Sequence, residues 1–248
     1  MFATDLLAGK SALVTGASSG LGRHFAQVLA AHGASVVAAA RRVAELEALV
    51  ATLGGGAKAV ALDLRDPAAV ESTMAALGPM DIVVNNAGVA HTQPALDVAE
   101  DDWQRVLDTN LSGAFRVTRG AARALRDAQR GGAIVNVASV LGYRVAKQVP
   151  AYVAAKAGLI RLTEALALEL APLRIRVNAL APGYIETDLN RAFLQSSTGE
   201  TMMKRVAARR FGQPPDLDGA LLLLASDAGR YIYGTTITVD GGHMLSWL

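Results

Sequence analysis

The stretch SALVTGASSGLG, residues 11–22, determines the fold that we expect for this 248-residue chain. Its first half is a short apolar run typical of a buried strand, and its glycine-rich second half leads into a helix expected from about Leu21 to His32. Glycines at a strand end let the backbone approach a ligand closely, and the N-terminus of the next helix supplies free N–H groups and a positive dipole end. The stretch therefore predicts a turn that binds a pyrophosphate. A glycine-rich turn without a ligand is the alternative, because such a pattern alone is weak.

Strands and helices alternate along the rest of the chain. Further strands are expected at residues 35–40, 57–64, 80–88, 132–139, 175–183 and 235–242. Helices are expected at residues 43–53, 67–77, 100–128, 149–170 and 217–226. Short apolar strands that alternate with helices indicate a parallel sheet covered on both faces. Because no linker interrupts the pattern, we expect one domain over residues 1–248, an α/β doubly wound fold with a parallel seven-stranded sheet, whose ligands bind at the carboxyl ends of the strands.

The composition limits the classes of function. The chain carries 24 Lys and Arg against 22 Asp and Glu, with no run of basic residues, so a nucleic-acid partner is not expected. It has no cysteine, which excludes disulfides and thiolate catalysis. Its scattered histidines lack the spacing of metal ligands, so no metal site is expected; they are His24, His32, His91 and His243. The apolar runs are too short for a membrane span and MFATDLLAGK does not resemble a secretory signal, so a cytoplasmic protein is expected.

The end of the second strand, Ala40-Arg41-Arg42, bears on the choice of cofactor. In dinucleotide-binding folds an acid at this point holds the ribose of NAD, whereas arginine suits the phosphate of NADP. Two cations at the start of the next helix also oppose its dipole, and a bound phosphate would remove that conflict. Two solvated arginines are the ordinary alternative. The sequence favours NADP over NAD.

Tyr152 and Lys156 stand four residues apart near the start of the otherwise apolar helix VPAYVAAKAGLIRLTEALALEL, residues 149–170. Side chains at this spacing share one face of a helix. By itself the pair is compatible with two surface residues whose stems lie on apolar neighbours. Its meaning therefore depends on the other motifs in the chain.

Those motifs together resemble the short-chain dehydrogenase/reductase family along essentially the whole chain. They are TGASSGLG at 15–22, NNAG at 85–88, Asn110 in DTNLSGAF, Ser139 in NVAS, YVAAK at 152–156 and PG at 182–183. The resemblance implies a Rossmann-type fold and an NAD(P)-dependent oxidoreductase that interconverts a ketone and a secondary alcohol by hydride transfer. A non-catalytic dinucleotide-sensing regulator on the same fold is the alternative. A methyltransferase, a further rival, would have no use for the serine, tyrosine and lysine in this register.

The resemblance implies four catalytic residues, Asn110, Ser139, Tyr152 and Lys156. Tyr152 would act as the general acid and base, although a free tyrosine, with a pKa of about 10, holds its proton tightly. Lys156 beside it is expected to lower that pKa and to hold the nicotinamide ribose. Ser139 would orient the substrate oxygen, and Asn110 would hold a water that relays protons.

The resemblance also implies the residues that bind the cofactor. Asp63 would contact the adenine ring, Asn86 and Gly88 the adenosine ribose, and Thr187 the carboxamide. From the residues alone, Asp63 could instead begin a helix, Asn86 form a turn and Thr187 cap a helix. The complete expected set is Gly16, Ser18, Ser19, Gly20, Leu21, Gly22, Arg41, Arg42, Asp63, Leu64, Asn86, Ala87, Gly88, Tyr152, Lys156, Pro182, Gly183, Ile185 and Thr187.

The substrate pocket is expected to have mostly apolar walls. The residues that would line it are Leu141, Tyr143, Val149, Tyr184 and Phe193. Residues 188–211 are expected to form a lid, because the polar stretch QSSTGE interrupts two otherwise helical runs there. Amide exchange in this lid should be fast and should slow when cofactor and substrate bind. The sequence does not select among sugars, steroids, acyl thioesters and simple ketones.

Apolar helix surfaces and an apolar tail predict a homotetramer. Helix 149–170 is apolar on several faces and helix 100–128 carries a row of large apolar residues, so two chains could bury them in a four-helix interface across a two-fold axis. The family resemblance implies the same pairing. The C-terminal HMLSWL would form a second interface with Met244, Leu245, Trp247 and Leu248. A tail folded back on its own chain is the alternative.

Overall fold

A computed structural model describes residues 2–187 and 190–245, apart from the side chain of Phe193. Within these residues seven strands form one parallel sheet in the order β3-β2-β1-β4-β5-β6-β7. The strands are β1 (Ser11–Thr15), β2 (Ser35–Ala40), β3 (Lys58–Ala61), β4 (Ile82–Asn85), β5 (Gly132–Val137), β6 (Ile175–Pro182) and β7 (Thr236–Val239). The strand order reverses between β1 and β4, which is where ligands bind in open sheets of this kind. The predicted doubly wound α/β fold is confirmed.

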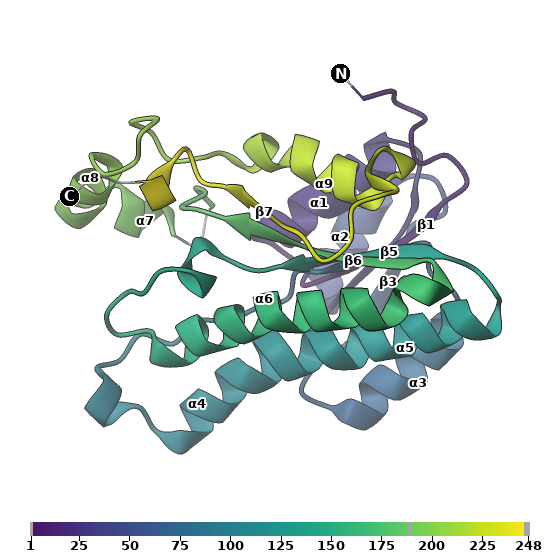
Figure 1. The fold of residues 1–248 in the computed structure, drawn as a ribbon, viewed down its shortest axis with the longest axis horizontal. Helices are drawn as coiled ribbons and strands as arrows, with labels where there is room; N and C mark the ends of the chain where they lie inside the picture. Colours follow the sequence, from purple (N-terminus) through teal and green to yellow (C-terminus); the bar gives the residue numbers. More distant parts are fainter. Residues whose placement is uncertain (1, 188–189, 246–248) are drawn as a thin grey trace.

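Helices cover both faces of the sheet (Figure 1). One face carries α1 (Gly20–Ala31), α2 (Val43–Leu53) and α9 (Asp218–Ala225). The opposite face carries α3 (Pro67–Leu77), α5 (Gly113–Asp127) and α6 (Pro150–Leu170), with α4 (Glu100–Leu107) packed on α6. Two large apolar clusters, one on each face, hold the three layers together. The central strands are therefore buried from both sides, as their sequences predict, whereas the edge strands β3 and β7 are only partly buried.

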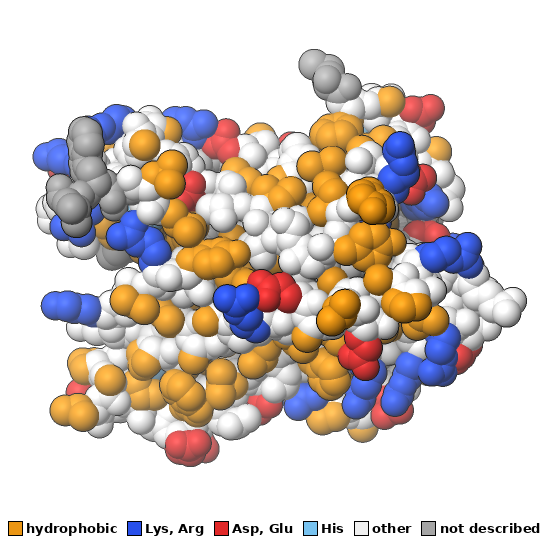
Figure 2. All heavy atoms as spheres, viewed as in Figure 1, with side chains coloured by type: hydrophobic (Ala, Val, Ile, Leu, Met, Phe, Trp, Pro, Cys, Tyr) orange, Lys and Arg blue, Asp and Glu red, His pale blue; other side chains and the backbone are white. Residues whose placement is uncertain are grey.

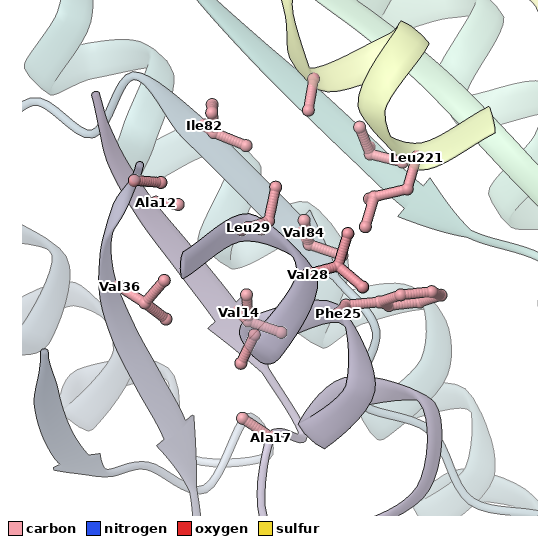
Figure 3. Packing of buried hydrophobic residues seen from close by; sticks show 14 of the residues in the cluster. Ala12, Val14, Ala17, Phe25, Val28, Leu29, Val36, Ile82, Val84 and Leu221 are labelled. Atoms are coloured by element: carbon pink, nitrogen blue, oxygen red, sulfur yellow. The ribbon is translucent and has the colours of Figure 1, made fainter. Parts of the chain in front are cut away.

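The helix that follows the glycine turn is fixed by its apolar stripe. Phe25, Val28 and Leu29 project from α1 onto the sheet beside Val14 and Val84 (Figure 3). Phe25 and Leu29 are fully buried, and burying a side chain of that size contributes about 2 kcal/mol. This packing fixes the direction of α1, and hence the position of its N-terminus at the carboxyl end of β1.

Several elements differ from their predicted bounds. The helix expected over 100–128 is interrupted by a turn of π-helix, η2 (Asp108–Ser112), between α4 and α5. β3, β4 and β7 each have 4 residues and are shorter than expected. The polar stretch QSSTGE interrupts the helical run only at Gln195 and Ser196, between α7 (Arg191–Leu194) and α8 (Ser197–Met203), and its last four residues begin α8. The Ser196 hydroxyl caps α8 by accepting from the Gly199 amide.

The carboxyl ends of the strands meet at one edge of the sheet. In Figure 1 this edge lies on the left, where β6 and β7 lead toward α7, α8 and the short helix η7 (His243–Leu245). The N-terminus of α6 and the turn η3 (Val140–Gly142) lie at the same edge. In the part of the chain that the structure describes, no helix is long and apolar enough to cross a membrane.

Candidate active site

The glycine turn after β1 packs against the loop after β4. Gly16 has φ +69°, and a Cβ atom there would lie only 2.7 Å from the Cα of Ala87, so both conformation and space require glycine. The Asn86 side-chain amide donates to the Thr15 carbonyl at 3.0 Å. The Thr15 hydroxyl in turn accepts from the backbone amides of Asn86 and Ala87, both at 3.1 Å. Asn86 therefore ties together the two loops that the sequence assigns to the cofactor.

The N-terminus of α1 can receive an anion. Its N-cap Ser19 makes no side-chain cap bond and its first turn contains no acid, so the first amides have no side-chain acceptor. Gly20 is exposed, and a Cβ atom there would lie 4.0 Å from the Thr187 methyl group. Thr187 thus lies across the turn from the start of α1. Its hydroxyl also donates to the Asn190 side chain at 3.2 Å.

Arg42 reaches the glycine turn directly. Its guanidinium donates to the Ser18 hydroxyl at 2.9 Å and to the Ser19 hydroxyl at 2.7 Å. It also lies 3.7 Å from the Glu45 carboxylate in the first turn of α2. The conflict that we expected between two cations and the dipole of α2 is therefore relieved in part by Glu45. Arg41 is exposed, and among the described residues its side chain has no hydrogen-bond or ion-pair partner.

The two expected cofactor residues of the loop after β3, Asp63 and Leu64, lie in different surroundings. The Asp63 carboxylate is bound by Arg65, with 2.7 Å between the closest atoms, and this hydrogen bonding holds the pKa of Asp63 below its usual value. Asp63 remains on the surface beside Arg41, which also lowers its pKa. The Leu64 side chain, in contrast, is buried in the core against Gly113 of α5. Leu64 therefore supports the end of β3, and its contact with the cofactor stays a prediction.

Tyr152 and Ser139 meet at the carboxyl edge. Ser139 follows β5, is 8% exposed and accepts from the Leu141 amide at 3.1 Å. Tyr152 lies in the first turn of α6, in a small apolar cluster with Val106 and Trp103. Burial raises the pKa of the Tyr152 phenol, a hydrogen bond with Ser139 lowers it in part, and the neighbouring Tyr184 phenol raises it. Tyr152 therefore retains its proton at neutral pH.

Lys156 lies beneath Tyr152 and is 4% exposed. Its Nζ donates to the Val137 carbonyl at 2.7 Å and lies 5.6 Å from the centre of the Tyr152 ring. Burial lowers the pKa of Lys156 to about 8. The expected lowering of the Tyr152 pKa by Lys156 is not seen, because burial of the phenol outweighs the other influences and raises that pKa.

Asn110 sits in the π-helical turn and is 1% exposed. Its side-chain oxygen accepts from the Val89 amide and its side-chain nitrogen donates to the Val89 carbonyl, both at 2.8 Å. A Cβ atom on Gly88 would lie 3.4 Å from the Asn110 oxygen and 3.7 Å from Lys156 Nζ. Asn110 thus holds the loop after β4 beside Lys156. The structure brings all four expected catalytic residues to one edge of the sheet.

The end of β6 forms the remaining wall. Pro182 pairs with Val239, and the Gly183 amide donates to the Val239 carbonyl at 2.9 Å. A Cβ atom on Gly183 would lie 2.6 Å from the Cβ of Asp240, so only glycine fits there. Ile185 is 5% exposed and belongs to the core cluster. Its expected contact with the cofactor stays a prediction.

A cluster of rings borders the site, and the sequence did not predict it. The Tyr184 ring lies 6.1 Å from Phe211 and 5.4 Å from His243, in edge-to-face arrangements. Arg144 fixes η7 in place by donating to the His243 and Met244 carbonyls, at 3.3 and 3.0 Å. The turn sequence Asp-Gly-Gly before His243 is the one signal that could have indicated this return of the chain.

The other expected substrate residues are exposed to different degrees. Leu141 and Val149 are half-buried, whereas Tyr143 is 47% exposed. Asp188 and the side chain of Phe193 lie outside the described residues. The role of residues 188–211 as a lid stays a prediction. Among the described residues, no group of three or more His, Asp or Glu side chains could hold a metal ion.

The chain is similar over nearly its whole length to known oxidoreductases. The family described as enoyl-(acyl carrier protein) reductase matches residues 16–244. The 3-oxoacyl-[acyl-carrier-protein] reductase of Escherichia coli is 40% identical over 94% of this chain and 97% of its own. A short-chain type dehydrogenase/reductase of Mycobacterium marinum is 38% identical, with a TM-score of 0.89 over 97% of each chain.

A third relative has a solved structure that contains ligands. The gluconate 5-dehydrogenase of Burkholderia cenocepacia, solved in complex with NADP and tartrate, is 34% identical. Its TM-score is 0.92 over 99% of this chain and 100% of its own. These proteins resemble this chain in both sequence and fold. The motifs at the carboxyl edge indicate the same family. This chain belongs to the short-chain dehydrogenase/reductase family.

Proposed function

We propose that this protein is an NAD(P)-dependent oxidoreductase, with NADP preferred, that interconverts a small-molecule ketone and a secondary alcohol. The observation that carries the proposal is the buried grouping of Tyr152, Ser139 and Lys156 beside the glycine turn. The related enzymes support it, since they reduce 3-oxoacyl groups or oxidise gluconate by their names, and one of them holds NADP. A regulator that only senses the dinucleotide would have no need of this grouping.

The residues at the carboxyl edge fit a dinucleotide. The uncapped start of α1 would hold its pyrophosphate, and Arg41, Arg42 and Ser18 would hold the additional phosphate of NADP. Asp63 would lie at its adenine end, and Lys156 and Thr187 at its nicotinamide end. The cofactor, when bound, supplies or accepts the hydride.

The protein's own groups would manage the proton and the substrate oxygen. Tyr152, which keeps its proton because burial raises its pKa, would donate that proton to the oxygen of the ketone. Ser139 would donate a hydrogen bond to the same oxygen. The Lys156 ammonium would favour the phenolate that remains, and Asn110 would hold the water through which the proton is restored.

The proposed function is tested by following the absorbance of the reduced cofactor with purified protein. The panel should include a 3-oxoacyl thioester and a keto sugar acid, the two substrate classes that the names of the related enzymes suggest. Turnover of one ketone with NADPH, and of the matching alcohol with NADP, is the expected result. Tight cofactor binding without turnover of any member of a broad panel would favour the sensing regulator.

The pH dependence should report the charge on Lys156. Below about pH 8 its ammonium is charged, and above that value the charge is lost because burial lowers its pKa. We therefore expect kcat for ketone reduction to decline as the pH rises through about 8. The measurement is a pH profile of kcat with saturating cofactor. A profile that stays flat to well above this pH would remove the Lys156 charge from the mechanism.

We further propose that the protein assembles as a homotetramer. Hydrophobic atoms gather over α4 and the start of α6 in the lower left of Figure 2. Phe115 of α5 is 37% exposed and Leu168 of α6 is 83% exposed, so these helices keep apolar surface that the chain does not bury. At the tail, Leu245 is 83% exposed although η7 is bound by Arg144; Trp247 and Leu248 lie outside the described residues.

Light scattering on the purified protein should give a mass of about four chains, and about two chains for a form that ends at residue 243. A monomer at micromolar concentration would contradict the whole assembly. A truncated form that remains tetrameric would instead mean that the tail packs on its own chain, as its contact with Arg144 also allows.

A further inference from the structure

A cavity of about 320 Å³ lies at the amino edge of the sheet, opposite the catalytic residues. It forms where the starts of β1, β4, β5, β6 and β7 meet the end of α9. In Figure 1 this edge is on the right, away from η7 and α8. The residues that line it are Leu6, Leu7, Lys10, Asp81, Ile82, Gly131, Gly132, Ala133, Arg174, Arg176, Ala225, Ser226, Asp227, Arg230 and Tyr233. No residue of the proposed active site is among them.

The walls of this cavity carry more positive than negative charge. Its cationic side chains are Lys10, Arg174, Arg176 and Arg230, and its acids are Asp81 and Asp227. Asp81 is already engaged: it accepts from the Ser11 amide and hydroxyl, each at 2.9 Å, and from Arg130. These hydrogen bonds, together with the Arg130 charge, outweigh burial and hold the pKa of Asp81 below its usual value. Asp81 therefore stays ionised and is paired with Arg130, a residue outside the lining of the cavity.

Arg176 is also engaged and is buried at 7% exposure. It donates to the Leu224 carbonyl at 2.8 Å and to the Ser226 carbonyl at 3.0 Å, so it satisfies the C-terminal end of α9. It is one of the residues that line the cavity. Tyr233 and Asp227 are close enough to Arg176 to influence its pKa, which places the tyrosine hydroxyl at the same wall.

Two of the cations are free to bind a ligand. Within the described part of the chain, the Lys10 and Arg230 side chains have no hydrogen-bond or ion-pair partner, and both residues are exposed at the mouth of the cavity. Arg174 uses one nitrogen to donate to the Gln129 carbonyl at 2.9 Å, which leaves its other donors available. The three side chains come from the segment before β1, the segment before β6 and the turn after α9. They converge on one cavity from three separate parts of the chain.

We propose that this cavity binds a small-molecule polyanion, of the size and charge of a phosphate monoester or a tricarboxylate. The volume is at the lower end of the range for small-molecule sites, which suits a compact ligand. Arg174 and Arg230 would bind its anionic oxygens through their paired donors, and Lys10 would supply a third charge. The ligand would thereby link the start of β1 to the turn after α9, and would stabilise the folded chain by mass action.

Isothermal titration calorimetry with pyrophosphate, and separately with citrate, tests the proposal. The parent protein should bind one anion per chain at this site, and the anion should raise the melting temperature. The double variant Lys10→Ala/Arg230→Ala should bind it roughly ten-fold more weakly or worse, because two charge-assisted contacts are lost. Both side chains are exposed, so the variant is expected to fold; its melting temperature without anion checks this. Preference for pyrophosphate or for citrate identifies the class of ligand.

Two control variants separate this cavity from other sites. Lys58→Ala removes an exposed lysine from the same edge of the sheet, at the start of β3 and outside the cavity, and should bind the anion as the parent does. Arg42→Ala removes the hydrogen bonds to Ser18 and Ser19 in the glycine turn, and it should leave anion binding at the cavity unchanged. Equal affinity in the parent and the Lys10→Ala/Arg230→Ala variant, loss of binding in Arg42→Ala alone, or no anion binding at all would each overturn the proposal. None of these outcomes depends on the proposed enzymatic activity.

Discussion

Tyr152→Phe is expected to lower kcat for ketone reduction by roughly 10²–10⁴-fold, the usual contribution of a positioned general acid. The substitution keeps the ring, which packs with Val106 and Trp103 between α4 and α6, so the fold should be retained. It removes the proton that the buried phenol holds and the hydrogen bond with Ser139. Steady-state kinetics with the best substrate of the panel measures the loss, and fluorescence titration should give an unchanged Kd for the cofactor.

Tyr231→Phe is the matched control for this variant. Tyr231 is 95% exposed and lies between α9 and β7, so loss of its hydroxyl should leave kcat at the parent value. Substantial residual turnover in Tyr152→Phe would remove Tyr152 from the proton transfer. A large loss accompanied by weaker cofactor binding would mean that the phenol supports the cofactor rather than the chemistry.

The fold could be predicted where local chemistry decides the structure. α3 occupies its predicted bounds because Asp66 accepts from the Ala68 and Ala69 amides, Pro67 opens the helix and Gly78 ends it. Each of these signals lies within a few residues of the element that it controls. The apolar strands likewise follow from their own sequences, because most positions of a strand buried on both faces are apolar; Asn136 in β5 and Arg176 and Asn178 in β6 are buried polar exceptions.

The π-helical turn at Asn110 could not be predicted in the same way. The apolar positions of residues 100–128 are compatible with one continuous helix, and they do not mark where a π turn begins. What distinguishes the turn is the paired hydrogen bond between Asn110 and the Val89 backbone, which joins residues 21 positions apart. Only the tertiary structure brings the two together.

The candidate site was predicted by residue type more fully than by geometry. The motifs identified Tyr152, Ser139 and Lys156, but not the Val137 carbonyl that Lys156 binds in the interior. They also gave no indication that Leu64 is needed for the core, since its burial depends on its fit against α5. The expectation of a lowered pKa for Tyr152 was wrong for a similar reason. That pKa depends on burial, which a sequence motif does not report.

Ala40→Asp combined with Arg41→Ala is expected to shift the ratio of kcat/KM for NADP over NAD toward NAD, on the order of 100-fold. Arg41 is exposed at the end of β2 and lacks a partner within the described residues, so it is available to the additional phosphate of NADP. An aspartate at residue 40 would accept hydrogen bonds from the ribose hydroxyls of NAD and repel that phosphate. Steady-state kinetics with each cofactor provides the ratio.

The two substitutions should act separately on the affinities for NADP and NAD. Arg41→Ala alone should weaken NADP but leave NAD unaffected, whereas the aspartate is needed to improve NAD. Arg42 stays in place in both variants, held by Ser18 and Ser19, so some affinity for NADP should persist even in the double variant. Ala40 is only 8% exposed, so a melting curve must show that the added carboxylate is tolerated at the end of β2. If the variant melts like the parent and its ratio of kcat/KM for NADP over NAD does not change, then Arg41 is a solvated surface charge. Recognition of the phosphate would then fall to Arg42, Ser18 and Ser19.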